Sequence, residues 1–131
     1  MNKWLIVGID SNIGNEISKR LKSQGKRVIG TSRVPNKTRQ PDFNCLDLRQ
    51  DPANWEIPDG VKVAIFCASI TSVRECRLNP ILSNQVNVIS TITLLKRLVD
   101  RDIHVVFPSS TLVFDGNTPY QKTNDPTNPL T

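Results

Sequence analysis

The stretch that decides the fold is WLIVGIDSNIG, residues 4–14. Its four leading apolar residues predict a buried strand, and the chain then runs through Gly8 into a helix-like segment that ends near Gly25. Gly8 permits a sharp turn from strand to helix, and Gly14 lets the helix pack closely on the strand. Amides at the start of such a helix can hold a pyrophosphate, so the stretch predicts a dinucleotide-binding turn.

The turn departs from the usual glycine pattern at one position, where Ser11 replaces the middle glycine. That glycine normally lets the backbone approach the phosphates, whereas a serine is small enough to fit and can donate its hydroxyl to a phosphate. Two glycines six residues apart also occur in ordinary tight turns between a strand and a helix. The predicted strand before the turn and the predicted helix after it therefore support dinucleotide binding more strongly than the two glycines do.

The segment after the turn has the pattern of a complete strand–helix–strand unit. Ile13, Ile17 and Leu21 recur at four-residue spacing and predict an amphipathic helix, which Gly25 closes as a C-terminal cap. A second strand over 27–31 follows after a very short link. This order of elements is the one that a parallel sheet requires.

Three further strands are predicted, over 43–46, 61–68 and 103–107. The run over 61–68 is apolar apart from Lys62, which is typical of a central strand that is covered on both faces. With helical segments between the strands, the fold class is α/β: a Rossmann-like doubly wound parallel sheet of about five strands in the order 3-2-1-4-5. All 131 residues form one domain.

A long helix is predicted from Pro80 to Arg101, because proline is favoured in a first helical turn and apolar residues follow with helical spacing. This helix is apolar on more than one side: one face is traced by Leu82, Val86, Ile89, Thr93 and Lys96, and another by Leu94, Leu95, Leu98 and Val99. A single helical turn is expected between Asp47 and Trp55. Beyond residue 108 the composition shifts to Gly, Asn, Pro and Thr, and no further strand or long helix is predicted.

Composition and charge exclude several classes of function. The formal net charge is +5, but the 17 Lys and Arg residues are dispersed, which argues against a nucleic-acid partner. The densest cluster is Lys26, Arg27, Arg33, Lys37 and Arg39, and a polyphosphate ligand explains it equally well. No apolar run has membrane-spanning length and no secretory signal is recognisable, so we expect no membrane association and a cytoplasmic location.

The three cysteines, Cys45, Cys67 and Cys76, have neither metal-type spacing nor an even number, so we expect reduced thiols and no metal site. Cys67 falls within the predicted central strand and is expected to be a small core residue. A nucleophilic cysteine would need a base, and the single histidine, His104, opens another strand.

The residues after the second strand predict which dinucleotide binds. An NAD site usually has an acidic residue about twenty positions past the turn, where it binds the ribose 2′-hydroxyl. Here the corresponding residues are Thr31, Ser32 and Arg33, so a guanidinium is available and no carboxylate follows the strand. This favours NADP over NAD, with Arg33 as the 2′-phosphate ligand. The alternative is that Arg33 is a solvated loop cation.

The chain resembles the extended short-chain dehydrogenases/reductases, the superfamily of NAD-dependent epimerases and dehydratases, and most closely the dTDP-4-dehydrorhamnose reductase branch. The resemblance covers nearly the whole chain and rests on the turn from Gly8 to Gly14, Asp47-Leu48, "VAIFCASITSVREC" with Asn79-Pro80, "VNV" at 86–88 and "SSTLVFDG" at 109–116. Ser11 departs from the family pattern.

The resemblance implies roles for individual residues. Asn12 and Ile13 would offer amides to the pyrophosphate, and Asp47 and Leu48 would contact the adenine. The cofactor would also be lined by Cys67, Ala68, Ser69 and, near the nicotinamide-side ribose, Thr71, and the family asparagine on the long helix, Asn87, would belong to the cofactor site. Ser110 matches the catalytic Ser/Thr that hydrogen-bonds the reacting oxygen of the substrate. From the residues alone, Ser109 to Thr111 would be a polar strand end whose side chains hydrogen-bond its own backbone.

The family's second catalytic motif is absent from these residues. A Tyr-x-x-x-Lys pair should follow Ser110 by about two dozen residues, with the tyrosine as general acid/base and the lysine lowering its pKa. That position falls just past Thr131, and Tyr120 cannot substitute because Asn124 stands four residues after it. We therefore expect a chain truncated before the Tyr-x-x-x-Lys helix and the substrate lobe.

The sequence leaves three functions open. The first is the NADP(H)-binding part of a nucleotide-sugar reductase, epimerase or dehydratase, catalytically incomplete as this chain, with a sugar nucleotide as a further ligand. The second is a module that senses a nucleotide without turnover, and the third is a structural partner without a ligand. Because a helix that would cover residues 80–101 is missing, we also expect an exposed apolar face there, which favours a homo-oligomer or another partner.

Overall fold

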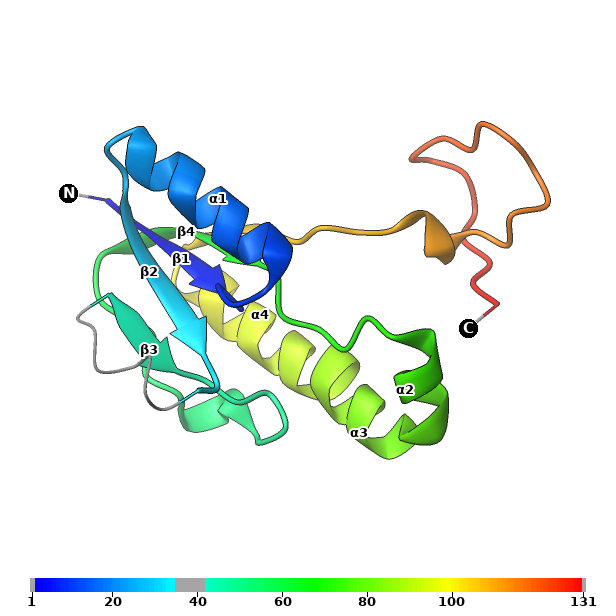
Figure 1. Ribbon diagram of the computed structural model, residues 1–131, viewed down its shortest axis with the longest axis horizontal. Helices are drawn as coiled ribbons and strands as arrows, with labels where there is room; N and C mark the ends of the chain where they lie inside the picture. Colours follow the sequence, from blue (N-terminus) through cyan, green and yellow to red (C-terminus); the bar gives the residue numbers. More distant parts are fainter. Residues whose placement is uncertain (1, 35–41, 131) are drawn as a thin grey trace.

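A parallel five-stranded sheet organises the molecule, and the computed structural model describes it over residues 2–34 and 42–130 (Figure 1). The strand order is β3-β2-β1-β4-β5, which confirms the predicted order 3-2-1-4-5 and the Rossmann-like α/β class. The strands are β1 (Lys3–Val7), β2 (Arg27–Ser32), β3 (Phe43–Cys45), β4 (Val61–Phe66) and β5 (His104–Val106). The predicted cationic cluster is wrong for its described members, because Lys26 and Arg27 lie at the start of β2 and Arg33 follows its end. Lys37 and Arg39 lie outside the described residues.

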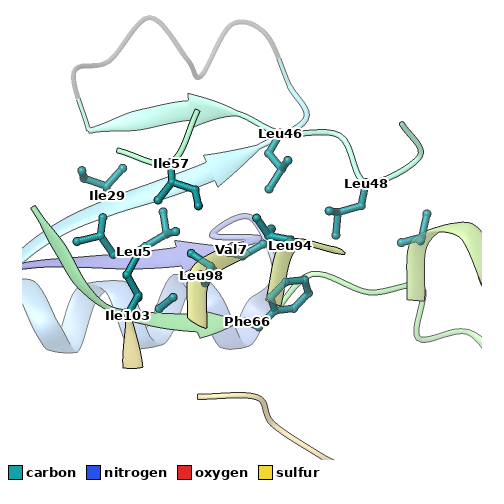
Figure 2. Close-up of a cluster of buried hydrophobic side chains, with 13 residues drawn as sticks. Leu5, Val7, Ile29, Leu46, Leu48, Ile57, Phe66, Leu94, Leu98 and Ile103 are labelled. Atoms are coloured by element: carbon teal, nitrogen blue, oxygen red, sulfur yellow. The ribbon is translucent and has the colours of Figure 1, made fainter. Parts of the chain in front are cut away.

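Helices cover both faces of the sheet. β1 is apolar on each side, so both of its faces must be shielded from water. α1 (Asn12–Ser23) lies over one face, where Ile6 packs with Ile9 and Val28. The opposite face holds the larger core, to which β1 contributes Leu5 and Val7 (Figure 2). Alternating residues of one strand thus enter two different cores, as the twofold repeat of a strand requires.

The long helix on the second face is not a regular α-helix. It consists of α3 (Pro80–Asn84), a π-helical stretch η3 (Gln85–Ser90) and α4 (Thr91–Asp100). The wider turn moves later residues around the helix axis relative to earlier ones, so the predicted face from Leu82 to Lys96 is wrong, whereas the predicted face in α4 is confirmed for Leu94, Leu95 and Leu98 but not for the exposed Val99. The buried stripe combines Val86 and Ser90 with Leu94 and Leu98, two leucines that Figure 2 shows among the other core side chains, while Ile89 is 49% exposed.

One helix was not predicted from the sequence. α2 (Val73–Leu78) begins after Ser72, whose hydroxyl accepts a hydrogen bond from the Glu75 amide at 3.2 Å. The spacing of Ser72 and Glu75 is that of a capping box, a signal that could have located this helix. The single helical turn expected before Trp55 is confirmed as the 3₁₀ turn η2 (Pro52–Asn54).

The segment after β5 runs away from the sheet. Figure 1 shows it, in orange and red, extending past the end of the long helix and folding back on itself. It contains the 3₁₀ turn η4 (Thr111–Val113), and the Asn128 amide closes the loop by donating to the Val113 carbonyl at 2.9 Å. Within the part of the chain that the structure describes, no helix has the length and apolarity to cross a bilayer.

Several large apolar side chains on the long helix face outward, as predicted. The exposed positions are Ile81, Val88, Ile89, Ile92 and Val99, with exposed fractions between 44% and 87%. An isolated exposed apolar residue is normal on a protein surface, but five on one helical segment form a candidate contact face. Assembly into a homo-oligomer through this face stays a prediction.

The turn after β1 leaves no room for a side chain on Gly8. Its φ is +84°, and a Cβ built there would lie 2.8 Å from Ala68, the second residue after β4. Gly25 also has a positive φ, +73°, but a Cβ there meets no atom within 4 Å. A side chain at either position would be strained by the positive φ, but only a side chain at Gly8 would also overlap a neighbouring atom. Comparing substitutions at the two glycines therefore isolates the cost of the overlap.

We predict that Gly8→Ala is more destabilising than Gly25→Ala. Both variants carry the left-handed backbone penalty of about 1 kcal/mol, and Gly8→Ala adds an overlap cost of about 1–3 kcal/mol. Urea unfolding of the two variants measures the difference. Equal losses of unfolding free energy would show that the contact with Ala68 does not constrain the turn.

Candidate functional site

A cleft of about 610 Å³ opens at the carboxyl ends of the central strands. This volume lies within the range of small-molecule sites, and the position is where open α/β sheets bind ligands. The cleft brings together ten of the predicted site residues: Gly8, Ser11, Ser32, Arg33, Asp47, Leu48, Cys67, Ala68, Ser69 and Thr71. They come from segments that follow β1, β2, β3 and β4, because parallel strands end at a common edge of the sheet.

The first turn is held by hydrogen bonds within the loop. Ser11 has extended backbone, with φ −68° and ψ 154°, so the missing middle glycine imposes no strain. Its hydroxyl accepts from the Gly14 amide at 3.0 Å and donates to the Gly8 carbonyl at 2.9 Å. Ser11 is therefore the N-cap of α1, and its hydroxyl is engaged by the turn itself.

The start of α1 keeps donors suited to an anion. Asn12 and Ile13 form the first turn of the helix, where backbone N–H groups have no intrahelical acceptor. Both residues are exposed, and Gly14 behind them is buried, with the space for a Cβ only 2.4 Å from the Gly8 carbonyl oxygen. Close packing of α1 on the turn and the first-turn amides both fit the binding of a pyrophosphate, although Asn12, Ile13 and Gly14 are not among the residues that line the cleft.

The end of β2 forms the next part of the cleft. The Thr31 hydroxyl accepts from the Gly8 amide at 3.0 Å and ties this strand to the first turn. Ser32 is buried, and its hydroxyl donates to a carboxylate oxygen of Asp10 while accepting from the Val34 amide at 3.0 Å. The sequence places no carboxylate after β2, but the fold brings one there from the first turn.

The residues after β3 carry an ion pair on the rim of the cleft. Arg49 donates to both carboxylate oxygens of Asp47, at distances from 2.5 to 2.9 Å. These hydrogen bonds, aided by the positive charge of Arg33, lower the pKa of Asp47 below its ordinary value. Asp47 is therefore ionised at neutral pH, and Leu48 beside it is buried in the main core.

The loop after β4 forms the opposite wall. Cys67 lies directly after the strand rather than within it, because β4 ends at Phe66, and its side chain is only partly buried. The predicted assignment of Cys67 as a residue within the strand is wrong for that reason. Burial raises the pKa of its thiol, so it is protonated at neutral pH and is a poor nucleophile.

Asn87 holds this loop from the long helix. Its Oδ1 accepts from the Ile70 amide at 2.8 Å, and its Nδ2 donates to the Ile70 carbonyl at 2.9 Å. Ile70, Ser69 and Thr71 line the cleft, whereas Asn87 itself does not. Asn87 is thus a positioning residue that fixes the backbone of the cleft wall.

The structure does not bring Ser110 to the cleft. Ser110 is exposed in the segment that leaves the sheet after β5, and its hydroxyl accepts from the Leu112 amide at 3.2 Å as the cap of η4. The described residues after β5 therefore do not line the cleft. Tyr120 lies farther along the same segment and is 96% exposed.

Three charged residues of the cleft, Asp10, Arg49 and Glu75, were not predicted from the sequence. Asp10 stands inside the glycine turn, and the capping-box signal would have placed Glu75 at the start of α2. Across residues 2–34 and 42–130 no group of His, Cys, Asp and Glu side chains has the arrangement of a metal site.

The fold and the position of the cleft are those of the Rossmann-like domains found in the reductases and epimerases of the short-chain dehydrogenase/reductase class. A family model described as the RmlD substrate binding domain matches residues 2–131, and the chain belongs to this family. This confirms the resemblance to the dTDP-4-dehydrorhamnose reductase branch.

Individual relatives agree with this assignment. The chain is 28% identical over 129 residues to a probable low-salt glycan biosynthesis reductase, Agl14, of Haloferax volcanii, covering 92% of this chain and 42% of the relative. It is also 28% identical to a hypothetical dTDP-4-dehydrorhamnose reductase from Sulfolobus tokodaii, with a TM-score of 0.80 over 98% of this chain and 46% of that structure.

A more distant structure shares the fold. MoeE5 in complex with UDP-glucose and NAD is 21% identical, with a TM-score of 0.80 over 99% of this chain and 44% of that chain. In each of these three comparisons the chain spans less than half the length of the similar protein.

We predict that Asn87→Ala loosens the loop over 68–72. The variant removes both hydrogen bonds to Ile70, and the expected loss of unfolding free energy is about 1–2 kcal/mol. Hydrogen exchange of the loop amides should accelerate. Asn84→Ala, at an exposed position of the same helical segment, is the control. Unchanged exchange in Asn87→Ala would contradict the positioning role.

Proposed function

We propose that these 131 residues form the NADP(H)-binding part of a nucleotide-sugar reductase, epimerase or dehydratase. The observation that carries the proposal is the cleft, in which the glycine turn meets residues that follow β2, β3 and β4. Membership of the RmlD substrate binding domain family supports the nucleotide-sugar chemistry. The NAD and UDP-glucose bound by MoeE5, a protein of the same fold, support a dinucleotide and a sugar nucleotide as the two ligands.

The cofactor-binding roles follow from the positions of the residues. The first-turn amides of Asn12 and Ile13 would hold the pyrophosphate, while Ser32 and Arg33 would contact the adenosine ribose. Cys67, Ala68, Ser69 and Thr71 would line the remainder of the cofactor, and Asp47 and Leu48 would contact the adenine. The cofactor would supply hydride transfer, and the protein would supply its binding and orientation.

NADP(H) is proposed over NAD(H) because Arg33 is an exposed guanidinium beside the cleft. Arginine binds phosphate groups with two parallel hydrogen bonds, which a 2′-phosphate can accept and a 2′-hydroxyl cannot. Arg49, the other arginine of the described cleft, is engaged by Asp47.

Catalysis would require groups in addition to those of the cleft. Ser110 is proposed to hydrogen-bond the reacting oxygen of the substrate, and this role needs the segment after β5 to move toward the cleft. These residues contain no Tyr-x-x-x-Lys pair, since Tyr120 is the single tyrosine. We therefore propose that the 131-residue chain binds the cofactor without completing turnover.

Binding without turnover is also expected of a nucleotide-sensing module, and assays of a longer chain separate the two functions. NADPH oxidation in the presence of sugar nucleotides would favour the reductase when a following Tyr-x-x-x-Lys segment is included. A cytoplasmic location, the absence of a nucleic-acid partner and homo-oligomer formation remain predictions from the sequence.

We predict that the protein binds NADP(H) more tightly than NAD(H), and that Arg33→Asp narrows or reverses this preference. The variant replaces the 2′-phosphate ligand by a group that repels it. Isothermal titration with both cofactors measures the ratio of dissociation constants. Lys26→Asp makes the same charge change before β2, at the opposite end of that strand, and should leave the ratio unchanged. Equal affinities of the unmodified protein for both cofactors would contradict the role of Arg33.

A further inference from the structure

Two arginines line the cleft from the ends of two neighbouring strands. Arg33 directly follows β2, and Arg49 belongs to the segment that follows β3. The two strands pair in parallel up to their last residues, with Ser32 opposite Cys45, and the Leu46 amide then donates to the Ser32 carbonyl at 3.0 Å. The segments that carry the two arginines therefore leave the sheet next to each other.

Asp47 interacts with both arginines. Its carboxylate accepts hydrogen bonds from Arg49, and the positive charge of Arg33 contributes to the low pKa of the same carboxyl group. Both guanidinium groups therefore lie within electrostatic range of one carboxylate. Two cations around a single anion leave an excess of positive charge at this edge of the cleft, which suits an anionic group of a ligand.

Asp47 occupies only one edge of the Arg49 guanidinium. Asp47 Oδ1 accepts from Arg49 Nε at 2.9 Å and from the Arg49 amide at 3.0 Å, and Asp47 Oδ2 accepts from Nη2 at 2.5 Å. These bonds orient the guanidinium, although 53% of the Arg49 side chain is exposed. A guanidinium has five N–H donors in a planar fork, so the edge formed by Nη1 and Nη2 can bind a second anion.

We propose that Arg49 is a second specificity-determining residue, which binds the 2′-phosphate of NADP(H) together with Arg33, and that Asp47 positions it. A phosphate monoester carries nearly two negative charges and three acceptor oxygens, which arginines from two strand ends can share. The 2′-hydroxyl of NAD(H) is uncharged and cannot make these contacts. The proposal rests on the proposed function, because it assumes that the adenosine ribose lies at the end of β2.

The test measures dissociation constants for Arg49→Gln, which removes the charge. The probes are NADP⁺ and NAD⁺, together with adenosine 2′,5′-bisphosphate and 5′-AMP, which carry the same difference without the nicotinamide half. We expect the variant to decrease the preference for the 2′-phosphorylated member of each pair by about fivefold or more at low salt. The affinities for NAD⁺ and 5′-AMP should not change, which also shows that the variant is folded.

Arg49→Lys tests the positioning by Asp47. Lysine keeps the charge but lacks the planar fork that can bind a carboxylate on one edge and a phosphate on another. This variant should therefore retain only part of the preference for the 2′-phosphorylated probes. Full retention would show that charge alone is sufficient and that Asp47 does not position the phosphate-binding group.

Arg27→Gln is the control, because it makes the same substitution at the start of β2, at the opposite end of that strand from Arg33. It should leave both ratios unchanged. If Arg49→Gln weakens both members of each pair equally, or leaves the ratios unchanged, Arg49 does not bind the 2′-phosphate. If the unmodified protein binds none of the four probes, the proposed function fails and this inference fails with it, which is distinct from a loss of selectivity in the variant.

Discussion

The close approach of the Gly8 turn to the end of β4 is the constraint on which the rest of the structure depends. With a Cβ position only 2.8 Å from Ala68, the chain can leave β1 over its neighbour only at a glycine. This turn directs α1 across one face of the sheet and brings its first amides to the carboxyl edge. The Thr31 and Ser32 hydroxyls then join the same turn to β2. The walls of the cleft are thus tied together by short polar contacts between neighbouring strand ends.

The strands and their order could be predicted from the sequence because each has a strong local signal. An apolar run such as 61–66 reads as a central strand, and the glycine turn fixes the direction of the first crossover. The π-helical stretch at Gln85–Ser90 could not be predicted in this way, since a single widened turn has no repeating pattern. It explains why Ile89 faces outward although regular α-helical spacing groups it with the buried Val86.

Site residues that directly follow strands could be predicted from the sequence. Residues that reach the site only through contacts between distant parts of the chain could not. Ser32, Arg33, Cys67 and Ala68 reach the cleft because parallel strands end at a common edge. Asp10 was missed because its partner is 22 residues away and only the folded chain brings them together. Ser110 matches a family motif, yet the segment that carries it leaves the sheet, so strand-end position alone did not fix its place.

The central claim is that a dinucleotide occupies the cleft, and protection of Cys67 from alkylation tests it most directly. Cys67 lines the cleft, whereas Cys45 is exposed at the end of β3 and serves as the internal reference. Because burial raises the pKa of Cys67, its labelling should be slower than that of Cys45 and should accelerate as the pH rises. Saturating NADPH should slow labelling of Cys67 by about tenfold, as expected for a site that is largely occupied, without affecting Cys45. Unchanged labelling of Cys67 under conditions where NADPH binds would contradict the claim.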